Sequence, residues 1–305
     1  MSVEGAALPP SGAIGSIDVA PFVRLPDPGE LFAARARRFG ELAATSDLAP
    51  YLRFLAGLAA AQHAVQDGLP APDRPDPDDV ARARAYAMPP LDRGRFLPDA
   101  AFEATVDRLL ALCEAIEMPV AAAAALARAA AAGPAERRAM IAAVLADRIP
   151  VEALAEHAFV AAALQVHFAR LAAGLDERAL VPVGDGACPA CGGPPVSSVV
   201  IGGRRAEGAR YCACSLCATQ WNYVRIKCTL CGTTENIGYQ EIEGGPGTVK
   251  AETCEACRAY VKVLYQNKDP SLDPVADDVA SLGLDLLMAE GEYRRGGVDP
   301  FLLGY

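Results

Sequence analysis

Aromatic residues and histidines are scarce in this sequence. Aromatics make up 6% of the 305 residues, and there are only one tryptophan and three histidines. With few aromatics and much alanine, the composition favours helices over a protein built from sheets. His63, His157 and His167 all lie in expected helices, and none belongs to an HExxH motif or to another dense group of histidines and carboxylates. We therefore expect core or surface histidines rather than metal ligands.

An export signal and a long apolar segment are also missing. The first twenty residues have no basic start followed by an apolar run. The most apolar stretch, residues 120–130, is mainly alanine, contains Arg128 and is too short to cross a bilayer. We therefore expect a soluble, cytoplasmic protein without membrane insertion. Because thiols stay reduced in the cytoplasm, clustered cysteines there are expected to bind metal or act as redox groups rather than form structural disulfides.

The chain has no excess of basic charge and no recognisable catalytic motif. Its net charge of −10 repels phosphate backbones and disfavours general nucleic-acid binding. Residues 184–268 carry nine basic and seven acidic side chains, so a local nucleic-acid contact stays open. The glycine-rich stretches 184–186 and 243–247 lack the helix and the lysine of a phosphate loop. No Ser/His/Asp arrangement can be argued, and we expect no catalytic residues.

The first half of the chain has the apolar spacing of helices. After an extended, Pro- and Gly-rich lead-in over residues 1–27, a helix is expected to begin at Asp27-Pro28, where an N-cap precedes a proline. A proline-rich break is expected at 69–79. Further helices are expected at about 48–66, 99–117, from 120, from 134, and 151–173. Their short connections predict an antiparallel helical bundle.

The pattern changes in the second half, beginning with prolines and glycines at 182–186. Short β-type runs follow at 197–201, 221–226 and 259–265, separated by glycine turns. A last helix is expected from about Pro274 to Glu290.

Nine of the ten cysteines lie between residues 188 and 257, and eight of them form four CxxC pairs. These pairs are Cys188/Cys191, Cys214/Cys217, Cys228/Cys231 and Cys254/Cys257. One constant shift along the chain places the first two pairs on the last two, so each half has the pattern C-x2-C-x22-C-x2-C. The chain thus contains an internal repeat of a four-cysteine unit.

Metal coordination explains this spacing. Two CxxC turns bring four thiolates into the tetrahedral array that Zn²⁺ or iron takes, with each sulfur at about 2.3 Å. Gly192 and Gly232 follow the first pair of each half and permit the positive φ that tight knuckles need. We therefore predict two four-cysteine metal sites. Their closed coordination shells favour structure, iron sensing or electron transfer over metal-catalysed hydrolysis.

Other interpretations of the cysteines stay open. Redox CxxC pairs normally begin a helix in a βαβ unit, and four duplicated pairs do not fit that arrangement. An iron–sulfur cluster is a further alternative, although the rubredoxin-like CPxCG and CxxCG knuckles favour single ions. We prefer sites in which the two CxxC turns of one half bind the same ion. The spacing also allows Cys188/Cys191 to share an ion with Cys228/Cys231. Cys212 and Cys113 are expected to be non-ligands, and Trp221 and Tyr223 are expected to pack over the knuckles.

Together these features predict an α+β fold with an N-terminal helical bundle, two tandem rubredoxin-like (zinc-ribbon-like) metal modules and a C-terminal helix. The expected parts are a helical domain at 1–183, a first metal module at 184–226, a second metal module at 227–268, and a C-terminal helix and tail at 269–305.

Several blocks of the sequence resemble the formate dehydrogenase accessory protein FdhE family. The block RYCACSLCATQWNYVRIKCTLCG at 210–232 and the tail KDPSLDPVADDVASLGLDLLM at 268–288 are the most specific in combination. The other blocks are at 51–62, 188–198, 250–263 and 298–304. Together they cover the second half densely and the helical half more loosely.

The resemblance implies a cytoplasmic, chaperone-like maturation factor that is needed for active respiratory formate dehydrogenase and is not itself an enzyme. It implies binding to the catalytic, molybdenum-containing subunit before twin-arginine export. It also implies a helical domain joined to two rubredoxin-like modules that bind iron, or alternatively zinc. The metal-ligand role carries over to Cys188, Cys191, Cys214, Cys217, Cys228, Cys231, Cys254 and Cys257, which are all present.

Two other functions stay open on the sequence. A rubredoxin-like protein that transfers electrons or senses oxygen would use the same eight cysteines with iron. A zinc-ribbon protein that binds nucleic acid would fit the CxxC pairs but not the net charge. Homodimer formation is a further open point.

Overall fold

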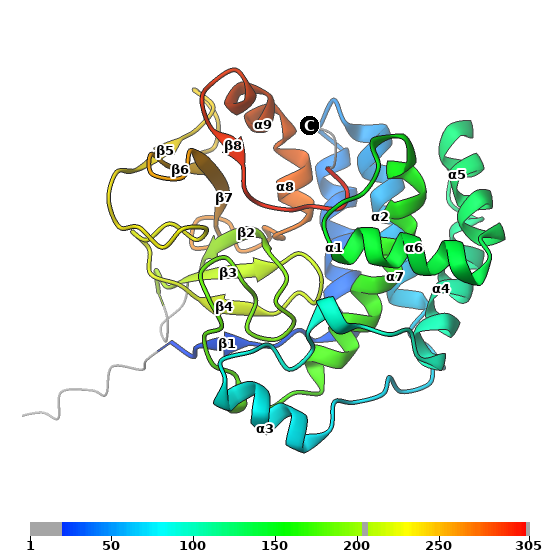
Figure 1. Cartoon of the computed structure of the whole chain (residues 1–305). Helices are drawn as coiled ribbons and strands as arrows, with labels where there is room; N and C mark the ends of the chain where they lie inside the picture. The colour runs from blue at the N-terminus through cyan, green and yellow to red at the C-terminus, as the bar shows by residue number, and fades with distance from the viewer. Residues whose placement is uncertain (1–19, 203–206, 303–305) are drawn as a thin grey trace, which may run out of the picture.

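The computed structural model describes residues 20–202 and 207–302 (Figure 1). Helices occupy the first half of this part of the chain, as the sequence predicts. They are α1 Pro28–Ala43, α2 Ala49–Ala64, α3 Pro77–Ala85, α4 Ala100–Cys113, α5 Val120–Ala131, α6 Pro134–Leu145 and α7 Leu154–Ala173. The expected extended lead-in lies largely outside the described residues, and its described end contains the short strand β1, Val23–Arg24.

The local sequence explains where these helices begin. The Asp27 carboxylate accepts a hydrogen bond from Gly29 N at 3.0 Å and caps α1, with Pro28 in the first turn, as predicted. Asp99 caps α4 through Phe102 N. Helix α7 is buried along most of its length and contacts α4, α5 and α6. It is therefore the central helix of this half.

Helix α3 departs from the prediction, which has only a proline-rich break in this part of the chain. Asp76 caps the helix by accepting a hydrogen bond from Asp78 N at 2.8 Å, and Pro77 lies in the first turn. None of the residues of α3 is buried. The helix therefore has no apolar stripe through which sequence periodicity could reveal it.

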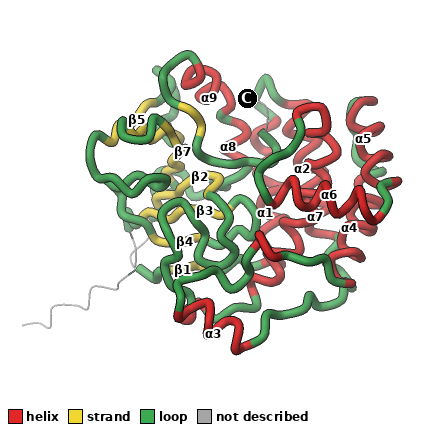
Figure 2. Tube along the Cα trace, in the orientation of Figure 1, coloured by secondary structure: helices red, strands yellow, loops and turns green. Residues whose placement is uncertain are grey.

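The strands of the second half form one sheet (Figure 2). They are β2 Pro195–Val200, β3 Arg210–Cys214, β4 Gln220–Asn222, β5 Ile237–Gln240, β6 Val249–Cys254, β7 Ala259–Tyr265 and β8 Arg294–Arg295. The order is β1-β4-β3-β2-β7-β6-β5, and β8 pairs with β7. The expected strand at 221–226 is too long, because the chain leaves the sheet after Asn222 to connect the two halves of the repeat.

The internal repeat of the sequence is visible in this sheet. Strands β2, β3 and β4 form one antiparallel meander, and β5, β6 and β7 form the second. Parallel pairing of β2 with β7, with Ser198 opposite Val263, joins the two meanders. The predicted boundary at 226/227 therefore falls between two halves of a continuous sheet, and the four-part division of the chain stays a prediction.

The expected single helix near the C-terminus is wrong in one respect, because it is divided at Ser281 into α8 Ala276–Ala280 and α9 Leu282–Ala289. Lys262 Nζ, from β7, donates hydrogen bonds to the carbonyls of Asp278 and Ser281 at 2.7 and 3.1 Å. In a continuous helix these carbonyls would accept from N–H groups one turn later. The lysine thus bonds both carbonyls at the break, although Ser281 O also accepts from Leu284 N at 2.9 Å.

The helices and the sheet share one hydrophobic core. Its members include Phe159 and Leu164 of α7 together with Cys191, Leu216 and Trp221 from the first half of the repeat. In Figure 1 the sheet lies on one side and α1, α2 and α4–α7 on the other, with α3 below the sheet and α8 next to the boundary between the two sides. The first half of the repeat is thus packed against the helical part.

None of the described helices is long and apolar enough to cross a membrane.

Candidate metal centres

The first four-cysteine group lies where the sheet meets the helices. Cys188 and Cys191 come from the turn before β2, Cys214 ends β3 and Cys217 follows it. The sulfur of Cys188 lies 3.6 Å from that of Cys217, and the Cys191 and Cys214 sulfurs are 3.4 Å apart. All four side chains are buried, with exposed fractions of 2% or less.

The second four-cysteine group repeats this arrangement in the other half of the sheet. Cys228 and Cys231 lie in the turn before β5, Cys254 ends β6 and Cys257 follows it. The sulfurs of Cys228 and Cys257 are 3.8 Å apart, and those of Cys231 and Cys254 are 3.7 Å apart. Here Cys231 is exposed and Cys257 is partly exposed.

Each group has the geometry of a single tetrahedral metal site. In each, the four sulfurs lie within 4.8 Å of one another. A tetrahedron with metal–sulfur bonds of about 2.3 Å has sulfur–sulfur edges of about 3.8 Å, close to the observed distances. All ten cysteines are free thiols, so no disulfide competes for these sulfurs. The groups follow the halves of the repeat and do not alternate across them.

The knuckle backbone explains why the sulfurs converge. Gly192 and Gly232 both have a φ of 74°, the positive value expected from their positions. Their N–H groups donate to the carbonyls of Cys188 and Cys228 at 2.8 and 3.0 Å. The second CxxC turn of each half, the closing knuckle, has a non-glycine residue with a positive φ at the corresponding position.

At the closing knuckles, Ala218 has a φ of 58° and Arg258 a φ of 51°, and these two residues occupy equivalent positions of the repeat. Sequence reasoning missed them, because neither residue type indicates a positive φ. The repeat therefore extends to the backbone conformation of all four turns.

In each group, hydrogen bonding lowers the pKa of one cysteine. Burial raises the pKa of Cys188 well above its usual value and raises that of Cys228 to about 12. Burial also acts on Cys214 and Cys254, but hydrogen bonds from neighbouring thiols and backbone N–H groups outweigh it and lower both pKa values. A bound ion would displace the remaining thiol protons.

Iron bound in such a site would supply a one-electron redox couple, whereas zinc would supply only a cross-link. The four sulfurs leave no coordination position for water or substrate in either group.

The other two cysteines lie outside both groups. Cys113, in α4, is fully buried, and burial raises the pKa of its thiol to about 12. Cys212, in β3 opposite Trp221, is also fully buried, and burial raises its pKa to about 12. Trp221 packs in the core with the first group, and the Tyr223 hydroxyl donates to Cys228 O at 3.0 Å. These two aromatics thus connect the two knuckle regions.

The three histidines also lie apart from the cysteine groups. His63 is exposed, and His157 is buried with its Nδ1 at 2.7 Å from Ala153 O. His167, in α7, is 1% exposed and packs against the rings of Phe96 and Phe102. Burial lowers the pKa of His167 to about 4.

This shift predicts a stability change with pH. Above pH 6.5, the ordinary histidine pKa, His167 is neutral in the folded and unfolded states. Protonation of His167 then takes nothing from the free energy of unfolding. As pH falls from 6.5 to 4, only the unfolded state takes up the proton, and about 3 kcal/mol of unfolding free energy is lost. Urea denaturation of the protein and of His167→Leu at several pH values measures this. Relative to His167→Leu, the original protein should lose that amount of unfolding free energy between pH 6.5 and 4; an unchanged difference between the two proteins would contradict it.

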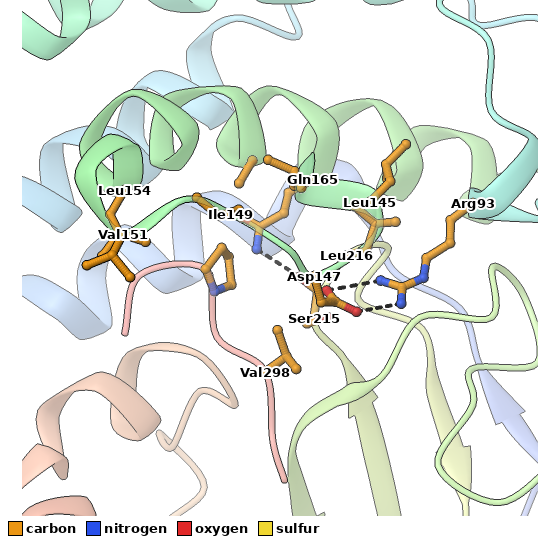
Figure 3. A pocket seen from close by; sticks show the side chains of 13 residues that line it. Arg93, Leu145, Asp147, Ile149, Val151, Leu154, Gln165, Ser215, Leu216 and Val298 are labelled. Carbon is orange, nitrogen blue, oxygen red and sulfur yellow. Dashed lines mark hydrogen bonds and ion pairs between the residues drawn. The ribbon is translucent and has the colours of Figure 1, made fainter. Parts of the chain in front are cut away.

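A pocket of about 160 Å³ lies beside the first group (Figure 3). Leu154 of α7, Leu216 of the second CxxC turn and Val298 of the C-terminal segment line it, so three separate parts of the chain meet there. Arg93 donates two hydrogen bonds to Asp147 at its edge, at 3.2 and 2.5 Å. No sequence motif indicated this pocket, because its walls come from segments far apart in the chain.

Three family models match consecutive parts of the chain. "FdhE, N-terminal" matches residues 20–185, "FdhE, central domain" matches 187–225, and "FdhE, C-terminal domain" matches 226–302.

Relatives and a solved structure agree with these matches. The chain is 53% identical to "Protein FdhE homolog" of Rhizobium meliloti, over the whole of both chains. It is 35% identical to "Protein FdhE" of Escherichia coli O9:H4, over 93% of this chain and 92% of that one. The crystal structure of the FdhE protein from Pseudomonas aeruginosa superposes with a TM-score of 0.83 at 35% identity, covering 93% of this chain and 99% of the other.

Proposed function

The chain belongs to the FdhE family, and from that premise we propose that it is a maturation factor that binds the catalytic subunit of respiratory formate dehydrogenase in the cytoplasm before export. Family membership supports an accessory protein related to formate dehydrogenase. Three points go beyond family membership: the catalytic subunit as the partner, the chaperone-like role and the cytoplasm as the compartment. We also propose that the protein is not itself an enzyme.

The single observation that carries this proposal is the pair of closed four-cysteine groups in a chain that matches FdhE along its length. Closed sites cannot present a metal-bound water or substrate, which argues for a scaffold rather than a catalyst. We assign all eight cysteines as ligands of two ions, iron or alternatively zinc.

The pocket beside the first group is the surface that we assign to the partner. Its walls come from the helical part, a metal knuckle and the C-terminal segment, so it exists only when all three are folded together. The lining is mainly apolar, and Arg93 with Asp147 gives one polar edge. This combination suits an apolar side chain with a polar neighbour from another protein.

Val151 tests this assignment, because it lines the pocket and is nevertheless 75% exposed. Val151→Glu places a charge at the pocket mouth, where it should lose its hydration when the partner binds. We expect binding of purified catalytic subunit to the immobilised protein to weaken about tenfold or more. Val120→Glu is the matched control, since Val120 is 87% exposed at the start of α5 and lies outside the pocket.

The outcomes separate the pocket assignment from the function. Equal binding by the original protein and both variants would contradict the pocket assignment alone. No binding by the original protein, together with intact formate-dependent respiration after deletion of its gene, would contradict the proposed function.

A further inference from the structure

The two cysteine groups form a matched comparison within one chain. They share the spacing, the knuckle hydrogen bonds and the positive-φ positions. Their closest sulfur–sulfur distances all lie between 3.4 and 3.8 Å. Any difference in how easily they exchange a metal must therefore come from what surrounds them.

The first group is buried beneath other parts of the protein. The loop before α4 covers its first knuckle, where Leu91 N donates to Ala190 O at 2.9 Å and Arg93 N donates to Cys191 O at 3.1 Å. Gln165 of α7 donates to Ser215 O, within the closing knuckle, at 2.9 Å. The four cysteines also belong to the main hydrophobic core. Cys214 lines a pocket of about 370 Å³, but all four cysteines are 2% exposed or less, so a reagent reaches this site less readily than the second.

The second group lacks this cover. None of its four cysteines belongs to a hydrophobic core cluster of the described residues. Leu216 in the first closing knuckle is 7% exposed, whereas Ala256, its equivalent in the second half of the repeat, is exposed. Cys191 is 0% exposed, whereas its equivalent, Cys231, is exposed. Figure 1 shows β5 and β6 at the end of the sheet away from α1–α7, where no helix of that set covers them.

The geometry points to a division of roles: the group of Cys228, Cys231, Cys254 and Cys257 is an exchange site, open to small thiol ligands through Cys231, and the first group is a permanent cross-link. This inference rests on the proposed ligand role of the eight cysteines.

In the exchange step an incoming thiol RSH forms a metal–sulfur bond as the bond from the metal to Cys231 breaks. The proton of the incoming thiol passes to the Cys231 sulfur. No electron changes hands, and the other three cysteines keep the ion in place. The exposed Cys231 thus allows one ligand to be replaced by another, while the number of sulfurs on the ion stays at four.

Metal release tests this inference. The full chain, loaded with Zn²⁺ and purified without oxygen, is mixed with the chromogenic chelator 4-(2-pyridylazo)resorcinol, and release is followed by absorbance. We expect two ions per chain in total, one leaving quickly and the other roughly tenfold or more slowly, because the four cysteines of the first site are buried. Adding glutathione should speed the fast phase alone.

Alkylation identifies the site without any substitution. Limited treatment of the loaded protein with iodoacetamide, followed by mass spectrometry, should modify Cys231 and Cys257 before any cysteine of the first group.

Cys231→Ser should abolish the fast phase of metal release and leave the slow phase unchanged. Its matched counterpart, Cys191→Ser, should remove the slow phase.

The results also distinguish the inference from its premise. Fewer than two bound ions at the start would contradict the ligand role of the eight cysteines. Two ions that leave at one common rate, or first alkylation within the Cys188/Cys191/Cys214/Cys217 group, would overturn the exchange role while leaving the ligand role intact.

Discussion

Cys217→Ser is expected to remove one of the two metal ions and to lower the free energy of unfolding by several kcal/mol. Structural zinc sites contribute roughly 10–16 kcal/mol to folding in peptides, and loss of one of four thiolates removes a large part of that. The loss of stability should extend to the helices, because the first group is part of their hydrophobic core. Metal analysis combined with urea denaturation, followed by circular dichroism at the helix band, measures both quantities.

Cys257→Ser is the matched comparison, since Cys257 is the equivalent ligand in the second half of the repeat. It should also cost one ion, but the helix signal should unfold at nearly the original urea concentration, because the second group lies outside the core clusters. Cys113→Ser controls for loss of a buried thiol and should retain both ions. If Cys217→Ser kept two ions, or if both ligand variants destabilised the helices equally, this account of the first site would fail.

Arg210→Met is expected to lower the free energy of unfolding by about 3–5 kcal/mol, the usual cost of breaking a buried ion pair. Arg210 in β3 donates to Ser198 Oγ at 3.0 Å and to Glu252 Oε1 at 2.8 Å, and its side chain is 1% exposed. It also donates to the carbonyl of Lys227 at 3.3 Å, in the connection between the halves. Removing it leaves the Glu252 carboxylate buried between the two meanders without its cation.

Lys250 provides the control for this prediction, because it is the residue equivalent to Arg210 in the repeat. Its ion pair with Glu241 is partly exposed, at 24% and 45% for the two side chains. Lys250→Met should therefore cost less than about 1 kcal/mol. Urea denaturation of both variants gives the comparison, and similar losses would contradict the role of Arg210 as the link between the halves.

The cysteine spacing predicted which sulfurs come together, because the spacing is a local property. A CxxC turn fixes two sulfurs within one short segment, and the constant shift from Cys188 to Cys228 identified which turns belong to the same repeat. Helices with a buried stripe, such as α2 with Leu52, Leu55 and Leu58, were equally accessible from periodicity. Helix α3 was not, because its side chains contact solvent rather than the core.

What the sequence could not reveal depends on contacts between distant residues. The pairing of Ser198 with Val263 makes one sheet of two repeats, and neither strand carries a signal for the other. The break at Ser281 lies where Lys262, from another element, bonds the carbonyls of Asp278 and Ser281. The unequal exposure of Cys191 and its equivalent in the second group comes from a cover that only the first site receives. The shared spacing therefore did not distinguish the two sites, and their surroundings made them different.

The most direct test of the central claim is X-ray absorption at the metal edge, combined with metal quantification, on protein purified without oxygen. The account predicts two ions per chain, each surrounded by four sulfurs at about 2.3 Å. Fewer than four sulfurs per ion, or nitrogen and oxygen ligands in their place, would contradict it.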